Sequence, residues 1–149
     1  MGVGKSCSGI SIAENFKTSY SAVDKRGIIL SSQNIRAGWR KTIFDPRKDD
    51  EQCTGDTYSL DEESDKMVVR DPEKIAKKQI KQFYEMHGYM AFAGTVKKHI
   101  QQGLIGISDE KARHLKTIEL IREKYSGRVL IIDEVHNVRG EATDKDTNA

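Results

Sequence analysis

Two short groups of residues, near opposite ends of this 149-residue chain, have the types and order that phosphate chemistry needs. The first group is Gly4-Lys5-Ser6, preceded by Gly2 and Val3. Glycine lets backbone N–H groups approach phosphate oxygens without an intervening Cβ, and a helix that starts there adds its partial positive charge. We expect Lys5 to reach the β- and γ-phosphates of a nucleotide and Ser6 to place its hydroxyl on Mg²⁺.

This triplet is the end of the P-loop pattern G-x-x-x-x-G-K-[ST], whose first glycine would precede Met1. Cys7 follows directly, in the first turn of the expected helix, and belongs to the same candidate nucleotide site. Taken alone, the triplet is also compatible with a flexible N-terminal tail.

The second group is Asp133-Glu134-Val135-His136, which follows the most apolar run of the chain, Val129–Ile132. A carboxylate at the end of a buried strand suits a nucleotide site, because ligands bind at the carboxyl ends of parallel strands. We expect Asp133 to hold Mg²⁺ through water, Glu134 to act as general base on the attacking water, and His136 to relay the phosphate state. An ordinary strand and turn is the alternative for this group alone. The two groups together favour a P-loop nucleotidase.

Runs of apolar residues alternate with helical patterns between these groups, which indicates an α/β layer with a mainly parallel sheet. Expected helices span residues 7–16, 34–43 with Asn34 as cap, 72–87, 95–102 with Thr95 as cap, and 108–125 with Leu115, Ile118, Leu120 and Ile121 inward. Expected strands span residues 28–30, 57–60, 67–69, 89–93 and 129–132, the last fully buried.

Composition bounds the class of protein. The chain is 36% hydrophobic and 32% charged, enough for one modest core, and no apolar run approaches the ~18 residues of a membrane span. No signal peptide is recognisable. Cys7 and Cys53 form neither a disulfide framework nor a zinc pair, so we expect a reducing, intracellular compartment with Cys7 as a small packing residue. Residues 1–44 and 66–128 are net basic and could supply phosphate contacts.

At this point the sequence resembles the superfamily 2 helicases. Gly2-Val3-Gly4-Lys5-Ser6 matches the end of helicase motif I, the segment Asp133–His136 is a DEVH form of the DExH box, and residues 27–33 look like motif Ia. The layout is more closely similar to the DExH helicases of large nucleocytoplasmic DNA viruses, a group that includes poxvirus-type early transcription factor ATPases. The segments that carry this closer likeness are residues 53–58, 89–100 and 132–139.

The resemblance implies a three-layer RecA-like P-loop domain, ATP and Mg²⁺ as cofactors, and a second RecA-like domain as partner. Residues 1–139 would form a partial first domain, incomplete at both ends, and residues 140–149 a polar, disordered tail. Catalysis would rest on Glu134 and Lys5. Because motifs III to VI are not found, we expect a fragment of a truncated gene or a longer protein, without substantial ATPase activity. A viral motor would act in the cytoplasmic viral factory or the virion.

The resemblance also implies contacts with the phosphates of DNA or RNA. The motif Ia candidates are Ser32, Gln33, Asn34 and Arg36, and the second position is Thr95, Lys97 and Lys98. Three alternatives stay open: a transcription-associated ATPase that moves on DNA without unwinding it, a non-catalytic remnant, and a small-molecule kinase.

Overall fold

The computed structural model describes residues 4–19, 26–48, 52–58 and 71–138. Within these ranges three strands, β1 (Gly27–Leu30), β2 (Tyr84–His87) and β3 (Leu130–Ile132), form one sheet in the order β2-β1-β3. Strand β1 pairs in parallel with both neighbours, with Ile29 opposite Met86 on one side and Ile131 on the other. The expected α/β class with a mainly parallel sheet is confirmed.

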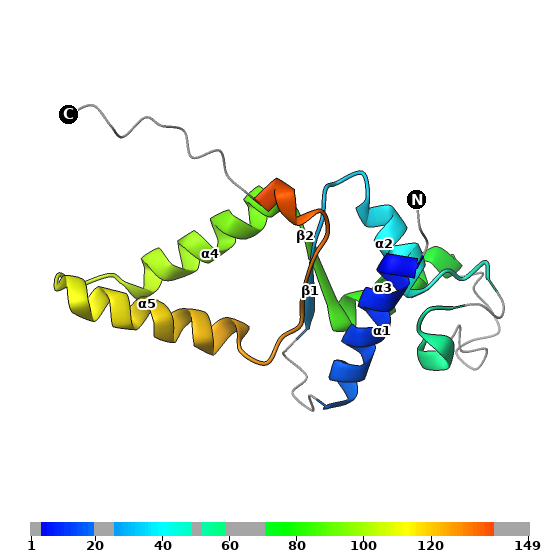
Figure 1. Ribbon diagram of the computed structural model, residues 1–149, viewed down its shortest axis with the longest axis horizontal. Helices are drawn as coiled ribbons and strands as arrows, with labels where there is room; N and C mark the ends of the chain where they lie inside the picture. Colours follow the sequence, from blue (N-terminus) through cyan, green and yellow to red (C-terminus); the bar gives the residue numbers. More distant parts are fainter. Residues whose placement is uncertain (1–3, 20–25, 49–51, 59–70, 139–149) are drawn as a thin grey trace.

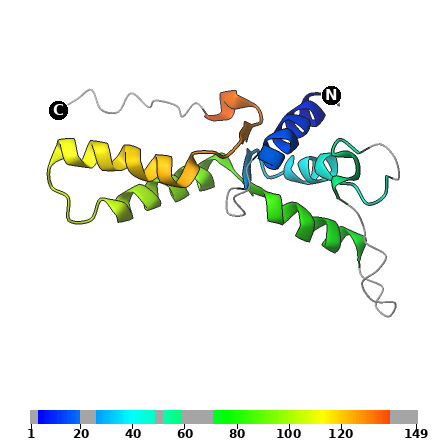
Figure 2. The same ribbon diagram turned by 90° about the horizontal axis from the view of Figure 1, so that it is seen from below.

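The helices of the same ranges are α1 (Gly4–Ser19), α2 (Arg36–Ile43), α3 (Pro72–Phe83), α4 (Tyr89–Gly103) and α5 (Glu110–Tyr125), with short 3₁₀ helices η1 (Gly55–Thr57) and η2 (Val135–Val138). Figures 1 and 2 show α1, α2 and α3 on one side of the sheet. On the other side, α4 and α5 form a hairpin that extends away from the strands.

The main core lies between the sheet and the first three helices. Glu14 of α1 sits at its border, where its Oε1 atom accepts hydrogen bonds from the hydroxyl groups of Tyr58 and Tyr84. Burial and the nearby Glu14 carboxylate raise the pKa of both tyrosines, so both stay neutral donors. The cluster consists of Ile10, Ala13, Ile29, Trp39, Ile43, Phe44, Tyr58, Ala76, Ile80 and Tyr84.

The α4–α5 hairpin buries far less. Among its described residues only Leu120 on α5 and Leu104 at the turn are buried, and Gly103 lies directly against Leu120. The expectation that four residues of α5 face inward is correct for Leu120, while Ile118 is half-buried. It is wrong for Leu115 and Ile121, which are 63% and 39% exposed, because α5 packs mainly along α4 and buries only a narrow stripe.

Residues 84–93 differ from the expectation in two ways. The helix that begins at Pro72 ends at Phe83, and the next four residues form β2. Tyr84 and Met86 face the core while Glu85 and His87 face the other way, an alternation of period two that the helical pattern hid. Residues 89–93 are the start of α4 and not a strand, because a short apolar run fits either element.

Other expectations have mixed outcomes. Asp71 caps α3 and Asp109 caps α5 through side-chain bonds, so both helix starts are confirmed. Thr57 lies in η1 and not in a strand, and the expected strand at residues 67–69 and the tail at 140–149 lie outside the described residues. Strand β3 is confirmed but not fully buried, since it is an edge of the sheet and Leu130 is 48% exposed.

The two cysteines are the clearest correction. Cys7 is not a free packing residue but forms a disulfide bond with Cys53, with the two Cα atoms 5.3 Å apart. Their separation of 46 residues in the sequence gave no sign of this proximity. The fold brings them together by packing residues 52–58 against α1.

Candidate nucleotide and nucleic-acid site

The carboxyl ends of the three parallel strands meet at one edge of the sheet. There the backbone N–H of Ser31 donates to the carbonyl of His87 at 3.1 Å, and the N–H of Asp133 donates to the carbonyl of Leu30 at 2.9 Å. These bonds extend the ladder one residue beyond each strand. They fix Asp133 beside the first residue after β1, at the edge where parallel sheets bind ligands.

Asp133 is positioned by side chains from two other elements. The indole N–H of Trp39, on α2, donates to Oδ2 of Asp133 at 2.9 Å. The hydroxyl of Tyr89, the first residue of α4, donates to the backbone carbonyl of Asp133. A half-buried carboxylate oriented in this way is suited to hold a metal ion or a metal-bound water.

Trp39 also connects Asp133 to α1, the helix that carries the phosphate triplet. Its side chain is buried, and its Cη2 atom lies 3.9 Å from the point where a Cβ on Gly9 would stand. Gly9 follows Gly4 by about 7 Å of helix rise. In Figure 2 the N-terminal end of α1 and η2, which follows Asp133, both lie towards the upper edge of the view.

The phosphate triplet forms the first turn of α1. The helix starts at Gly4, three residues earlier than expected, and the hydroxyl of Ser8 donates to the Gly4 carbonyl at 2.8 Å. Gly4 and Lys5 are exposed, while Ser6 and Cys7 are half-buried. Gly2 and Val3 lie outside the described residues.

Glu134 has the one positive φ among the described non-glycine residues, at 51°. A left-handed backbone is unfavourable for glutamate, and strain of this kind tends to occur at functional sites. It turns the chain from β3 into η2 and leaves the side chains of Glu134 and His136 58% and 70% exposed. Oε2 of Glu134 lies 3.3 Å from Nδ1 of His136, so the two candidate residues are paired.

Ser6 and Asp133 fit the ligand set of a magnesium ion bound to a nucleotide. Mg²⁺ prefers hard oxygen ligands and takes one or two from protein, with phosphate oxygens and water completing the set. Their hydroxyl and carboxylate are of that kind. In the part of the chain that the structure describes, no group of three or more His, Cys, Asp or Glu residues could hold a metal by itself. A metal there would therefore depend on the nucleotide.

The motif Ia candidates lie at the same edge of the sheet as Asp133. Ser32 is half-buried and Gln33 and Asn34 are exposed, in the turn between β1 and α2. Asn34 does not cap α2, because the N-cap position is Ile35 and makes no side-chain bond. Arg36, the first residue of α2, sets its Nη2 atom 2.7 Å from the point where a Cβ on Gly88 would stand.

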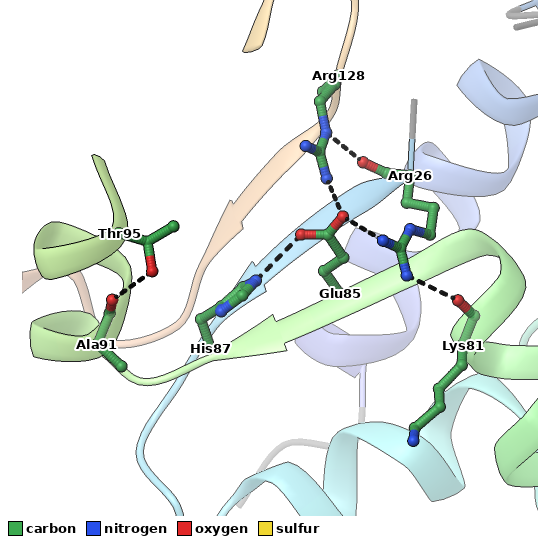
Figure 3. A network of polar contacts seen from close by, with 7 residues as sticks. All are labelled: Arg26, Lys81, Glu85, His87, Ala91, Thr95 and Arg128. Carbon is green, nitrogen blue, oxygen red and sulfur yellow. Dashed lines mark hydrogen bonds and ion pairs between the residues drawn. The ribbon is translucent and has the colours of Figure 1, made fainter. Parts of the chain in front are cut away.

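The second group of nucleic-acid candidates lies along α4. Thr95 is not a helix cap, because its hydroxyl donates to the Ala91 carbonyl at 2.9 Å in the helix interior (Figure 3). Lys97 and Lys98 are exposed. They follow Tyr89 by about 12 Å of helix rise. The structure thus separates these lysines from the residues around Asp133 and does not bring the two candidate groups into contact.

Sequence reasoning missed a polar network at the opposite face of the sheet from the main core (Figure 3). Oε1 of Glu85, on β2, lies 2.9 Å from a guanidinium nitrogen of Arg26 and of Arg128, and its Oε2 lies 3.1 Å from Nε2 of His87. Burial alone would raise the pKa of Glu85, but the bond from His87 and the two guanidinium groups outweigh it and hold that pKa below its usual value. The network joins the residues before β1 and β3 to β2.

Sequence reasoning also missed the polar roles of Trp39 and Tyr89. Trp39 was expected only as an apolar anchor of its helix. Neither has a motif around it that marks its hydrogen-bonding group, and 94 residues separate Trp39 from Asp133.

Searches among known proteins give one informative match. The chain is 28% identical, over 158 aligned positions, to a protein of Acanthamoeba polyphaga mimivirus that is named "Putative ATP-dependent RNA helicase". The alignment covers 93% of this chain and 13% of the mimivirus protein's length. No family model and no solved structure matches. The sequence is therefore helicase-like over nearly its whole length. In the described residues, no helix has the length and apolar character needed to cross a membrane.

Proposed function

We propose that residues 1–139 form part of the ATP-binding, RecA-like domain of a helicase or translocase driven by ATP on nucleic acid. The observation that carries this proposal is the fixed position of Asp133 at the carboxyl end of β3, linked through Trp39 to α1. The similarity to a helicase-named protein supports the same function. The sequence motifs further favour the DExH type of superfamily 2, of the viral kind, acting inside the cell.

In the proposed mechanism, each residue has one role. Backbone N–H groups of the Gly4–Ser6 turn and the Lys5 ammonium bind the phosphates, and Ser6 and Asp133 hold Mg²⁺. Glu134 accepts a proton from the attacking water. Phosphoryl transfer gains roughly 10³–10⁵ in rate from an arginine finger, which a second RecA-like domain would supply. We therefore expect this chain to bind Mg·ATP without hydrolysing it over many turnovers.

Calorimetric titration of the intact chain with Mg·ATP tests the nucleotide site. The Lys5→Ala variant should lose about tenfold or more in affinity, since a charge-assisted bond to phosphate is worth about 1.5–3 kcal/mol. Lys41→Ala removes a similarly exposed lysine from the last turn of α2 and should bind as the unaltered chain does. Equal affinities for the two variants, or no binding by the unaltered chain, would contradict the proposal and favour a non-catalytic remnant.

The nucleic-acid contacts are tested by the salt dependence of binding. Replacing both Lys97 and Lys98 by alanine should lower the slope of log K against log salt by about 1.4 for single strands, because each lost phosphate contact releases fewer counterions. Lys77 and Lys78 form an equally exposed adjacent pair on α3 and supply the control. A slope that falls equally in both double variants would remove Lys97 and Lys98 from the site.

A further inference from the structure

The disulfide bond joins the candidate phosphate turn to a separate part of the fold. Cys7 follows Ser6 directly in the first turn of α1, and its partner Cys53 lies 46 residues further along the chain. We propose that the Cys7–Cys53 bond is a reversible redox switch that sets the order of the phosphate turn and hence the affinity for nucleotide. This inference rests on the proposed function of the Gly4–Ser6 turn.

The Cys53 side of the bond is a fixed platform. The buried hydroxyl of Thr54 donates to the Ile43 carbonyl at 2.8 Å, and the Gln52 side chain donates to the carbonyls of Asp45 and Lys48 at 2.7 and 2.8 Å. The hydroxyl of Ser11 on α1 donates to the Cys53 carbonyl at 3.4 Å. Cys53 is therefore held by backbone contacts that do not depend on the disulfide.

The Cys7 side is held much less firmly. Gly4, Lys5 and Ser8 are exposed, and a Cβ on Gly4 would meet no atom within 4 Å. The first buried residue of α1 is Ile10, almost two turns into the helix. An unanchored helix end frays, so the covalent link to the platform is the strongest restraint on the turn that would bind phosphate.

Both sulfur-bearing residues are only half-buried, so a small thiol or disulfide can reach them. Oxidation would proceed by exchange with a low-molecular-weight disulfide such as glutathione disulfide. One cysteine thiolate attacks it, forms a mixed disulfide and releases one thiol. The second cysteine thiolate then attacks the protein sulfur of that mixed disulfide and releases the other thiol. One external disulfide is reduced to two thiols for each Cys7–Cys53 bond formed.

The direction of the switch follows from the bonded structure. With the bond in place, Gly4, Lys5 and Ser6 already form a helical turn. A preordered site does not lose conformational freedom when the ligand binds, so the oxidised chain should bind more tightly. Reduction should raise the Kd for Mg·ATP about three- to tenfold, the effect expected from ordering one or two residues.

The test compares the intact chain after treatment with glutathione disulfide or with tris(2-carboxyethyl)phosphine. Thiol titration should find no free thiol in the first sample and two in the second. Hydrogen exchange of the α1 amides near Cys7 should be about tenfold faster in the reduced chain, and Mg·ATP should bind it more weakly. The Cys53→Ser variant, which keeps Cys7, should match the reduced chain in both measurements and ignore the reductant.

Each contrary result is specific. Two free thiols after oxidation, or equal exchange of the α1 amides in both states, would overturn the switch. A chain that binds Mg·ATP equally well in both states would overturn the switch and leave the proposed function intact. If neither state binds Mg·ATP, the proposed function fails and the switch's nucleotide role fails with it.

Discussion

Asp133 illustrates how single residues define this site. Its backbone is fixed by the sheet and by Tyr89, and its carboxylate is oriented by the Trp39 indole. A neighbour that orients a metal ligand contributes to metal affinity without touching the metal. Trp39 is thus a positioning residue, and it is also the single tryptophan of the chain, which makes its fluorescence a specific reporter of this site.

The Trp39→Phe variant keeps an aromatic ring in the core but removes the N–H that orients Asp133. We expect the Mg²⁺-dependent part of ATP affinity to fall about tenfold, as is common when such a positioning bond is lost, while metal-free binding changes little. Titration of ATP with and without Mg²⁺ measures the difference. Tyr89→Phe removes the bond to the Asp133 carbonyl and leaves the carboxylate bond in place, so it serves as control. Equal losses in the two variants would remove the specific role of the indole.

Glu85 gives a prediction about pH. Its folded-state pKa is lowered, so its ion pairs stabilise the fold above the unfolded pKa of about 4.3 and lose that effect as the pH falls towards the folded value. Glu85→Gln should lower the free energy of unfolding by about 2 kcal/mol at neutral pH, because Arg128, with its side chain 8% exposed, loses a charged partner.

Urea unfolding at a series of pH values measures this effect. The difference between the unaltered chain and Glu85→Gln should shrink below about pH 4, where the carboxylate is protonated in both reference states. Glu119→Gln, which breaks an exposed pair with Lys116, should change stability by less than about 1 kcal/mol at any pH. A Glu85→Gln difference that stays constant down to pH 2 would contradict the electrostatic origin.

At the scale of elements, the α4–α5 hairpin depends on one close approach. The point where a Cβ on Gly103 would stand lies 2.4 Å from Cδ1 of Leu120, whereas Gly94, on the same helix, has no atom within 4 Å of that point. Gly103→Ala should therefore destabilise the fold by about 1–3 kcal/mol through overpacking. Gly94→Ala should stabilise it by up to about 1 kcal/mol, since alanine favours a helix interior.

Thermal unfolding followed by circular dichroism compares these two variants directly, because both make the same chemical change in the same helix. Melting temperatures that move in opposite directions would confirm the packing of α4 on α5. Two increases would show that the hairpin packs differently from the structure described here.

Elements with strong local signals could be predicted from sequence. Asp71 with Pro72, and Asp109, mark helix starts through short-range bonds that depend on neighbouring residues only. Strand β2 could not, because Tyr84 also continues the apolar stripe of α3 and becomes a strand residue only through pairing with Gly27. In the site, Lys5, Ser6 and Asp133 stand in recognisable motifs, whereas the Trp39 bond and the Cys7–Cys53 bond arise from long-range packing.

At the scale of the whole molecule, the buried cluster lies mostly on one side of a three-stranded sheet. The side with α1, α2 and α3 is well packed, while the opposite hairpin is largely exposed. This asymmetry suits a chain that is similar to 13% of a much longer protein, in which other segments could cover the hairpin. The central claim concerns the packed side, where two motifs 128 residues apart would share one nucleotide.

Paramagnetic broadening measures that shared site most directly, and a 16.8 kDa chain is within easy reach of amide NMR. Mn²⁺ would replace Mg²⁺ together with a non-hydrolysable ATP analogue, added to the intact chain and to Lys5→Ala. We predict that the amides of residues 4–7 and of residues 133–136 broaden together and that Lys5→Ala abolishes both effects. Broadening of only one of these two segments, or broadening confined to the acidic residues 45–65, would contradict the account.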